Sequence, residues 1–229
     1  MAHVFSTETL TITPYVEQYF EKMLLPLKDE MKEYKFAVSG PISAGKSTSL
    51  EILYMLFMKY NFKIGVLREY INSDPTIGNE LLGRFISGKT TNTTFQNYIL
   101  DTYRDTYFEI DKNKDNNIIM MERIPDDSIL IFANITNRNK PEDMNELSLY
   151  TLYNKMLNYD KLCDFPSYLD NDTKVESFIG NIDDVLLSMI DIIVNDIKGG
   201  VKKRIIGLKV DVNTSIMRIK RRGRKEESN

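Results

Sequence analysis

The sequence predicts an α/β protein with a doubly wound parallel sheet that is covered by helices on both faces. Short apolar runs of strand length alternate along the chain with longer segments whose apolar residues recur at helical spacing. This alternation is typical of parallel sheets. No internal repeat, low-complexity linker or domain boundary divides the 229 residues. We therefore expect a single domain over residues 1–229.

In the first half of the chain, helical and strand patterns alternate regularly. Pro26 should bend or split the first helix. The continuous apolar character of residues 62–68 predicts a buried parallel strand. The expected elements are a helix over residues 11–33, a strand over 35–39, a helix over 46–60, a strand over 62–68, and helices over 75–87 and 94–111 that flank a polar turn.

The second half continues the alternation with a longer helical stretch. Residues 118–121 are an apolar run that predicts another buried strand. The helical spacing over residues 175–198 is strongly apolar, and Gly199 and Gly200 end it. The remaining expected elements are helices from Pro125 onward and over 141–158, a loop over 159–172, a fourth strand over 204–210 and a last helix over 213–227.

Composition excludes several classes of protein. No apolar run is long enough to cross a bilayer, and the net charge of -3 does not favour nucleic acid, so we expect neither partner. The one cysteine, Cys163, permits no intrachain disulfide, and with the absence of a signal-like segment it predicts a reducing, cytoplasmic setting. The one histidine, His3, excludes a His/Cys zinc site and a Ser-His-Asp triad, which leaves acid–base chemistry to carboxylates.

The segment from Gly40 to Thr48 fits the pattern G-x-x-x-x-G-K-[ST] in full. Its glycines allow backbone N–H groups to curl around a phosphate, its lysine neutralises charge, and its serine hydroxyl binds Mg²⁺. Because an apolar run precedes it and a helical segment follows it, we favour a nucleoside triphosphate site over a chance match. The predicted phosphate-binding residues are Gly40, Ser43, Ala44, Gly45, Lys46, Ser47 and Thr48.

A carboxylate follows each of two predicted strands. Glu69 comes directly after the second strand, at the sheet edge where ligands of open α/β sheets bind, and is a candidate general base. The alternative for Glu69 is a surface ion pair with a neighbour such as Arg68. Glu122 ends the third apolar run, where phosphate-loop enzymes place a carboxylate on the metal side. We therefore predict Ser47 and Glu122 as the Mg²⁺ ligands.

These motifs, taken in order, resemble the deoxynucleoside kinase family, which phosphorylates the 5′-hydroxyl of deoxynucleosides. The last motif, a basic segment of the form R-x-x-x-R-x-R-x-E-E, is the most specific. The matching segments are Gly40–Thr48, Glu69, Thr94–Gln96, Glu122–Arg123 with Phe132–Ala133, Met144–Glu146 and Arg218–Glu227.

The resemblance implies a role for each matching position. Glu69 would accept the proton of the 5′-hydroxyl, Arg123 would hold that hydroxyl region, and Gln96 would bind the base edge through its amide. An ordinary solvent-facing glutamine is the alternative for Gln96. In a lid over about residues 218–228, Arg218, Arg222 and Arg224 would bind ATP phosphates and Glu227 would reach the sugar 3′-hydroxyl. A solvated helix end, a nuclear localisation patch or a nucleic-acid contact are the other interpretations of this basic segment.

The chain also departs from the family pattern. Phe85 stands where the family usually has a tyrosine that bonds the 3′-hydroxyl. Tyr103 and Ser128 replace the arginine and aspartate of members that accept deoxycytidine or purines, which favours a pyrimidine such as thymidine. The segment over about 159–198 is longer than the family's equivalent, and nothing follows Asn229 where the family has a further helix and strand. We accordingly expect a sheet of the P-loop nucleoside kinase type that lacks its last strand and helix.

The sequence therefore predicts a kinase that transfers a phosphoryl group from ATP to a deoxynucleoside 5′-hydroxyl, with Mg²⁺ as cofactor. The alternatives are a nucleoside monophosphate kinase of the thymidylate kinase type and a nucleotide-binding protein without catalysis. The resemblance further implies a homodimer that forms through helices.

Overall fold

The computed structural model describes residues 11–73, 75–112, 117–139 and 145–222. Its five strands form one parallel sheet in the order β2-β3-β1-β5-β4. The strands are β1 (Tyr34–Ser39), β2 (Ile64–Leu67), β3 (Ile118–Glu122), β4 (Thr173–Phe178) and β5 (Lys203–Leu208). The predicted α/β fold class is confirmed.

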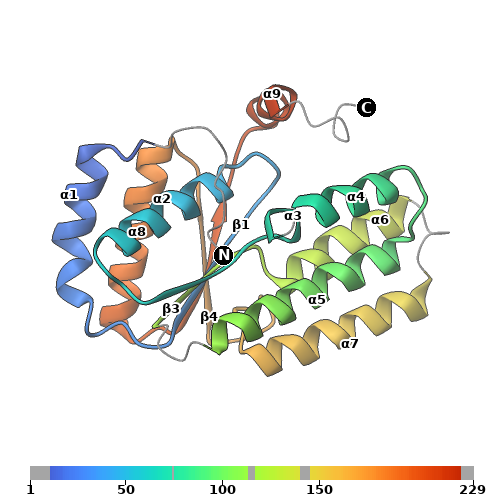
Figure 1. The fold of residues 1–229 in the computed structure, drawn as a ribbon, viewed down its shortest axis with the longest axis horizontal. Coiled ribbons are helices and arrows are strands. Elements are labelled where there is room, and N and C mark those ends of the chain that lie inside the picture. The colour runs from blue at the N-terminus through green and yellow to red at the C-terminus, as the bar shows by residue number, and fades with distance from the viewer. Residues whose placement is uncertain (1–10, 74, 113–116, 140–144, 223–229) are drawn as a thin grey trace.

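Helices cover both faces of this sheet (Figure 1). On one face lie α1 (Pro14–Met23), α2 (Lys46–Lys59) and α8 (Ile182–Gly199). On the other face lie α3 (Tyr70–Ser73), α4 (Pro75–Ile86), α5 (Asn92–Asp111), the π-helix η2 (Asp127–Ala133), α6 (Asn134–Asn139) and α7 (Glu146–Cys163). A 3₁₀ turn, η1 (Leu25–Leu27), follows α1 at Pro26, and α9 (Val212–Arg222) follows β5.

The sheet contains a strand where the sequence predicts only helix, so the expected start of that helix is wrong. Residues 173–178 form β4, and the helix of this segment begins at Ile182 and not at residue 175. β4 pairs in parallel with β5, with Phe178 opposite Leu208, and forms one edge of the sheet; because it precedes β5 in the chain, it is not the strand that the family has after the lid. Most side chains of β4 are exposed, because it is an edge strand, and it therefore lacks the apolar signal of a buried strand.

Smaller differences concern the ends of elements. α7 continues to Cys163, so the first part of the expected loop over residues 159–172 is helical. Asp164 ends α7 in the left-handed conformation, at φ 51°. β2 is the opposite edge strand of the sheet, and only alternate residues in it are buried, in contrast to the fully buried strand that its apolar sequence predicts.

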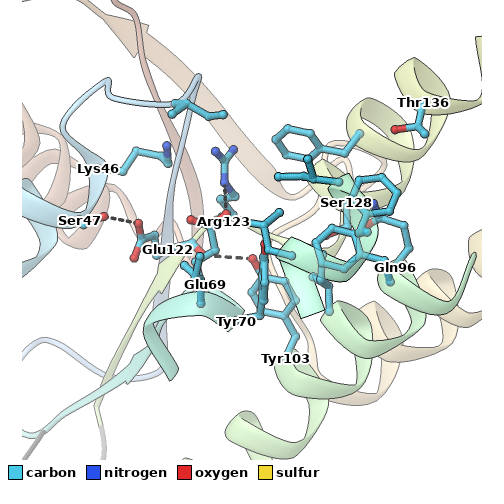
Figure 2. A pocket seen from close by; sticks show the side chains of 18 of the residues that line it. Lys46, Ser47, Glu69, Tyr70, Gln96, Tyr103, Glu122, Arg123, Ser128 and Thr136 are labelled. Carbon is cyan, nitrogen blue, oxygen red and sulfur yellow. Dashed lines mark hydrogen bonds and ion pairs between the residues drawn. The ribbon is translucent and has the colours of Figure 1, made fainter. Parts of the chain in front are cut away.

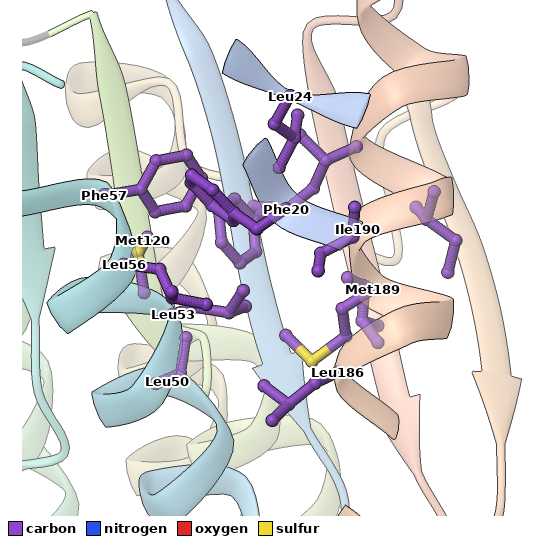
Figure 3. Close-up of a cluster of buried hydrophobic side chains, with 14 of the residues drawn as sticks. Phe20, Leu24, Leu50, Leu53, Leu56, Phe57, Met120, Leu186, Met189 and Ile190 are labelled. Atoms are coloured by element: carbon purple, nitrogen blue, oxygen red, sulfur yellow. The ribbon is translucent and has the colours of Figure 1, made fainter. Parts of the chain in front are cut away.

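The larger hydrophobic core lies between the sheet and α1, α2 and α8 (Figure 3). Phe20 of α1 packs edge to face against Phe57 of α2, with ring centroids 5.1 Å apart. Leu53 of α2 and Ile190 of α8 are fully buried in the same cluster. Burial of one such side chain stabilises the fold by about 1.5–3 kcal/mol. This core holds α2, and with it the loop that precedes α2, against the end of β1.

A buried polar network fixes α8 to the centre of the sheet. Asp196 of α8 accepts hydrogen bonds from Tyr34 Oη at 2.7 Å and from Arg204 Nε at 2.8 Å. Burial and the charge of Asp196 raise the pKa of Tyr34 well above its ordinary value. Because Tyr34 lies in β1 and Arg204 in β5, one carboxylate ties α8 to both strands.

Within the described residues, no helix is both long and apolar enough to cross a membrane.

Candidate active site

The loop between β1 and α2 has the backbone geometry that a phosphate-binding loop requires. Gly40 and Gly45 have φ angles of 134° and 95°, which residues with a Cβ rarely adopt. A Cβ on Gly40 would lie 2.2 Å from the carbonyl oxygen of Leu208, so only glycine fits this close approach to β5. Gly45 is the N-cap of α2, which directs the N-terminus of that helix at the loop.

Lys46 is buried at the base of this loop. Its Nζ donates a hydrogen bond to the carbonyl oxygen of Pro41 at 2.9 Å, and the residue is 5% exposed. Burial, together with the positive charge of Arg123, lowers the pKa of Lys46 to about 8. A bound anion would therefore stabilise the charged form of Lys46, as expected of a lysine that binds phosphate.

Ser47 and Glu122 meet on the α2 side of the site. Ser47 Oγ donates a hydrogen bond to Glu122 Oε1 at 2.5 Å (Figure 2). Both are hard oxygen ligands, and Mg²⁺ at phosphate sites uses one or two protein oxygens along with phosphate and water oxygens. The described residues contain no cluster of three or more His, Cys, Asp or Glu side chains that could hold a metal alone. Ser47 and Glu122 therefore fit Mg²⁺ that is shared with nucleotide phosphates.

Glu69 and Arg123 form the central ion pair of the site (Figure 2). Arg123 follows β3 with φ 66°, and its Nε donates to Glu69 Oε1 at 2.9 Å. Its Nη1 donates to the carbonyl oxygen of Gly40 at 3.0 Å, and its guanidinium lies 4.9 Å from the ring centroid of Phe132. Burial lowers the pKa of Arg123, but the charge of Glu69 and other carboxylates outweighs this and raises it. Glu69 thus pairs with a buried arginine that follows another strand.

A cavity of about 260 Å³ extends from the phosphate loop to α5. Its apolar wall includes Phe85 and Phe95, whose rings stack with centroids 4.5 Å apart. Gln96 lines the same cavity and is 2% exposed, which excludes the solvent-facing alternative. Tyr103 is held in place because its hydroxyl donates to the carbonyl oxygen of Glu122 at 3.1 Å.

Most of the predicted site residues converge on this cavity. Those that line it are Ser43, Gly45, Lys46, Ser47, Glu69, Phe85, Gln96, Tyr103, Glu122, Arg123 and Ser128. Gly40, Ala44 and Thr48 belong to the loop but not to the cavity wall.

The predicted lid lies only partly within the described residues. Arg218 of α9 donates from Nη1 to the carbonyl oxygen of Ser43 at 2.9 Å, which places it over the phosphate loop. Arg222 is in the last turn of α9, but its side chain, and all of Arg224 and Glu227, lie outside the described residues.

Sequence reasoning missed Asp127 and Tyr70. Asp127 is fully buried in the first turn of η2, where its Oδ2 accepts a hydrogen bond from Ser39 Oγ at 2.7 Å. Burial raises the pKa of Asp127, although its hydrogen bond from Ser39 and the charge of Arg123 oppose this. Tyr70 lines the cavity and packs edge to face on Phe95. An aspartate so close after Arg123 was the available signal for Asp127, whereas Tyr70 carries no distinctive pattern.

The fold and the loop together define an α/β protein of the P-loop nucleoside kinase type. The chain belongs to the deoxynucleoside kinase family, because the model of that family matches residues 36–184, more than half of its length. It is therefore a nucleotide-binding phosphotransferase of the nucleoside kinase kind. The predicted family resemblance is confirmed.

Solved structures to which the chain is similar include two kinases. Deoxyadenosine kinase from M. mycoides with bound dATP is 19% identical, covers 85% of this chain and 74% of its own, and superposes with a TM-score of 0.45. Thymidylate kinase from Ehrlichia chaffeensis is 15% identical, covers 82% of this chain and 96% of its own, and gives a TM-score of 0.38. The comparison with curated proteins finds no match.

Proposed function

We propose that the protein transfers the γ-phosphoryl group of ATP to the 5′-hydroxyl of a deoxynucleoside, as an enzyme of nucleotide salvage. The observation that carries this proposal is the cavity that places Glu69 and Arg123 between the phosphate loop and Gln96. A nucleoside whose base binds Gln96 would direct its sugar toward Glu69, and a triphosphate in the loop would direct its γ-phosphoryl group to the same place. Both substrates then meet beside Glu69 and Arg123.

In this mechanism Glu69 accepts the 5′-hydroxyl proton while the new O–P bond forms and the bond from the γ-phosphorus to ADP breaks. Arg123 orients Glu69 and the attacking oxygen, and Lys46 and Arg218 stabilise the charge of the transferred group. Ser47 and Glu122 would hold Mg²⁺, which when bound would supply positive charge to neutralise the ATP phosphates. Positioning of the substrates supplies most of the acceleration, and proton removal is a smaller contribution.

We further propose a preference for pyrimidine bases. Tyr103 and Ser128 line the cavity, at the positions where family members that accept deoxycytidine or purines have an arginine and an aspartate. The stacked rings of Phe85 and Phe95 form a flat wall on which a single-ring base fits. Phe85 has no hydroxyl for the 3′-position, so Glu227 of the lid is the proposed partner of the sugar, and Arg222 and Arg224 are proposed to join Arg218 on the phosphates.

The test is phosphoryl transfer from labelled ATP with Mg²⁺ to each of the four deoxynucleosides and to dTMP. Transfer to a pyrimidine deoxynucleoside, with 5′-monophosphate as product and loss of activity in EDTA, supports the proposal. Transfer to dTMP alone would assign the chain to the monophosphate kinases. Binding of ATP and nucleoside without transfer would instead show a nucleotide-binding protein without catalysis.

A further inference from the structure

Gln96 is hydrogen bonded to a second buried amide, that of Asn92, on one face of α5. The two residues are four positions apart, so helical geometry places them on the same face. Gln96 Nε2 donates to Asn92 Oδ1 at 3.1 Å, and the residues are 2% and 0% exposed. Gln96 lines the cavity (Figure 2), whereas Asn92 is not part of its wall. Asn92 therefore contacts the base-binding side chain from outside the cavity.

Each of these two amides is only half satisfied. Neither Gln96 Oε1 nor Asn92 Nδ2 has a hydrogen-bond partner among the described residues, although both atoms are buried. A buried polar atom without a partner costs about 1–3 kcal/mol. For Gln96 the missing partner can come from a ligand in the cavity, because this side chain is the one that lines it.

The hydrogen bond between the two amides can form in two ways. If both amide groups turn by half a rotation, Asn92 Nδ2 becomes the donor and Gln96 Oε1 the acceptor. Neither amide has another described side-chain partner that would favour one arrangement. Each arrangement keeps one hydrogen bond between the two amides and leaves one donor and one acceptor without a partner. The two arrangements differ in what Gln96 offers the cavity, since its oxygen and its NH₂ group exchange places.

We propose that Asn92 and Gln96 form a reversible amide pair that reads bases of either hydrogen-bonding polarity. A 4-oxo pyrimidine offers a ring N–H donor beside an exocyclic oxygen, whereas a 4-amino pyrimidine offers a ring nitrogen acceptor beside an exocyclic NH₂ group. One arrangement of Gln96 pairs with the first kind and the other arrangement with the second. The substrate class is then pyrimidine deoxynucleosides of both kinds, and Asn92 is a positioning residue. This inference rests on the proposed function of the same cavity.

The test compares Asn92→Asp with Asn92→Leu at pH 8.5, using thymidine and deoxycytidine as acceptors. An ionised carboxylate only accepts hydrogen bonds, so it fixes Gln96 with Nε2 toward residue 92 and prevents the exchange. Leucine removes the partner and leaves the Gln96 amide free to turn. The readouts are kcat/KM for transfer and Kd for nucleoside binding by calorimetry, which does not need turnover.

We expect the wild-type chain to use both nucleosides with kcat/KM values within about tenfold of each other. Asn92→Asp should shift the ratio of these values, and of the Kd values, by about tenfold or more, because the wrong base then meets unpaired buried groups. A lower pH that protonates the new carboxyl should return the ratio toward that of the wild type. Asn92→Leu should raise KM for both nucleosides and leave the ratio unchanged.

Asn97→Asp is the matched control, because Asn97 is on the same helix but hydrogen bonds to Lys155 and the carbonyl oxygen of Thr93. It should leave the ratio unchanged. The inference is overturned if Asn92→Asp keeps the wild-type ratio, if Asn92→Leu shifts it equally, or if the wild type rejects one nucleoside. A wild-type chain that binds and phosphorylates no nucleoside would overturn the proposed function itself.

Discussion

Lys46 holds a positive charge in a site that disfavours it until a phosphate is bound. Its pKa of about 8 lies below the ordinary lysine value of 10.5, mainly because the side chain is buried. Unfolding therefore takes up a proton between about pH 8 and 10.5, so this group makes the folded state more stable as the pH rises through that range. Below about pH 8 the buried charge carries its full cost.

We predict that Lys46→Met abolishes phosphoryl transfer and stabilises the ligand-free protein. Removal of the buried charge raises the free energy of unfolding by up to about 3 kcal/mol at pH 7. Loss of the hydrogen bond from Lys46 to the carbonyl oxygen of Pro41 offsets part of this gain. Urea unfolding at pH 7 and pH 10 should show that the difference from wild type shrinks as the pH rises. Lys22→Met, on the exposed face of α1, is the control and should show no such trend. A difference for Lys46→Met that is constant with pH would contradict this account.

Local signals were sufficient to find many of the residues that meet at the cavity. Lys46 belongs to a contiguous motif, and Glu69 and Arg123 each follow an apolar strand. The sequence does not identify Tyr70, because it contributes through a tertiary contact with Phe95, and the only local sign of Asp127 is its position shortly after Arg123. The amide pair of Asn92 and Gln96 has the spacing of one helical turn, but only burial shows that both side chains face inward.

The boundary between β4 and α8 cannot be predicted from the apolar pattern of the sequence. The strong apolar spacing of α8 predicts a helix that also covers most of β4. Val175 fits this helical spacing, although it lies in an edge strand and is 55% exposed. Pairing with β5 fixes this segment as a strand, and such pairing is a tertiary effect. The buried strands β1 and β3 were found because their apolar runs are continuous.

Asp196 is the residue on which the attachment of α8 depends. We predict that Asp196→Ala lowers the free energy of unfolding by about 3 kcal/mol, since it leaves the buried Tyr34 and the half-buried Arg204 without their shared acceptor. Glu176→Ala is the control, because Glu176 lies 3.8 Å from the same arginine but is 56% exposed, and we expect a cost below about 1 kcal/mol. Urea unfolding of both variants is the measurement. Equal costs would show that the buried network does not hold α8.

At the scale of the molecule, the fold class followed from the alternation of helices and strands, but the strand order did not. The order β2-β3-β1-β5-β4 places β2, β3 and β1 side by side, so that their carboxyl ends lie together. The phosphate-binding loop, Glu69 and Arg123 follow these three strand ends and meet there. β4 precedes β5 in the chain but lies outside it in the sheet, as an edge strand. The segment over 159–198, to which the sequence assigns no function, therefore supplies one edge strand of the sheet.

The expected homodimer is a property of the whole molecule that can be tested directly. α7 exposes Leu147 and Tyr150, which are 73% and 64% accessible, one turn apart on the same helix. We predict that light scattering after gel filtration gives twice the 26.6 kDa of one chain. The double variant Leu147→Glu, Tyr150→Glu should reduce this to one chain with its thermal stability retained. A single-chain mass for the wild type would contradict the prediction.

The most direct test of the proposed mechanism is the kcat of Glu69→Gln for transfer from ATP to a pyrimidine deoxynucleoside. The glutamine can still accept the hydrogen bond from Arg123 but cannot accept the 5′-hydroxyl proton at neutral pH. We predict that kcat falls by about 10²–10⁴-fold while KM for ATP changes little. A variant that keeps the wild-type kcat would contradict the assignment of Glu69 as the base and the proposed mechanism of phosphoryl transfer in this cavity.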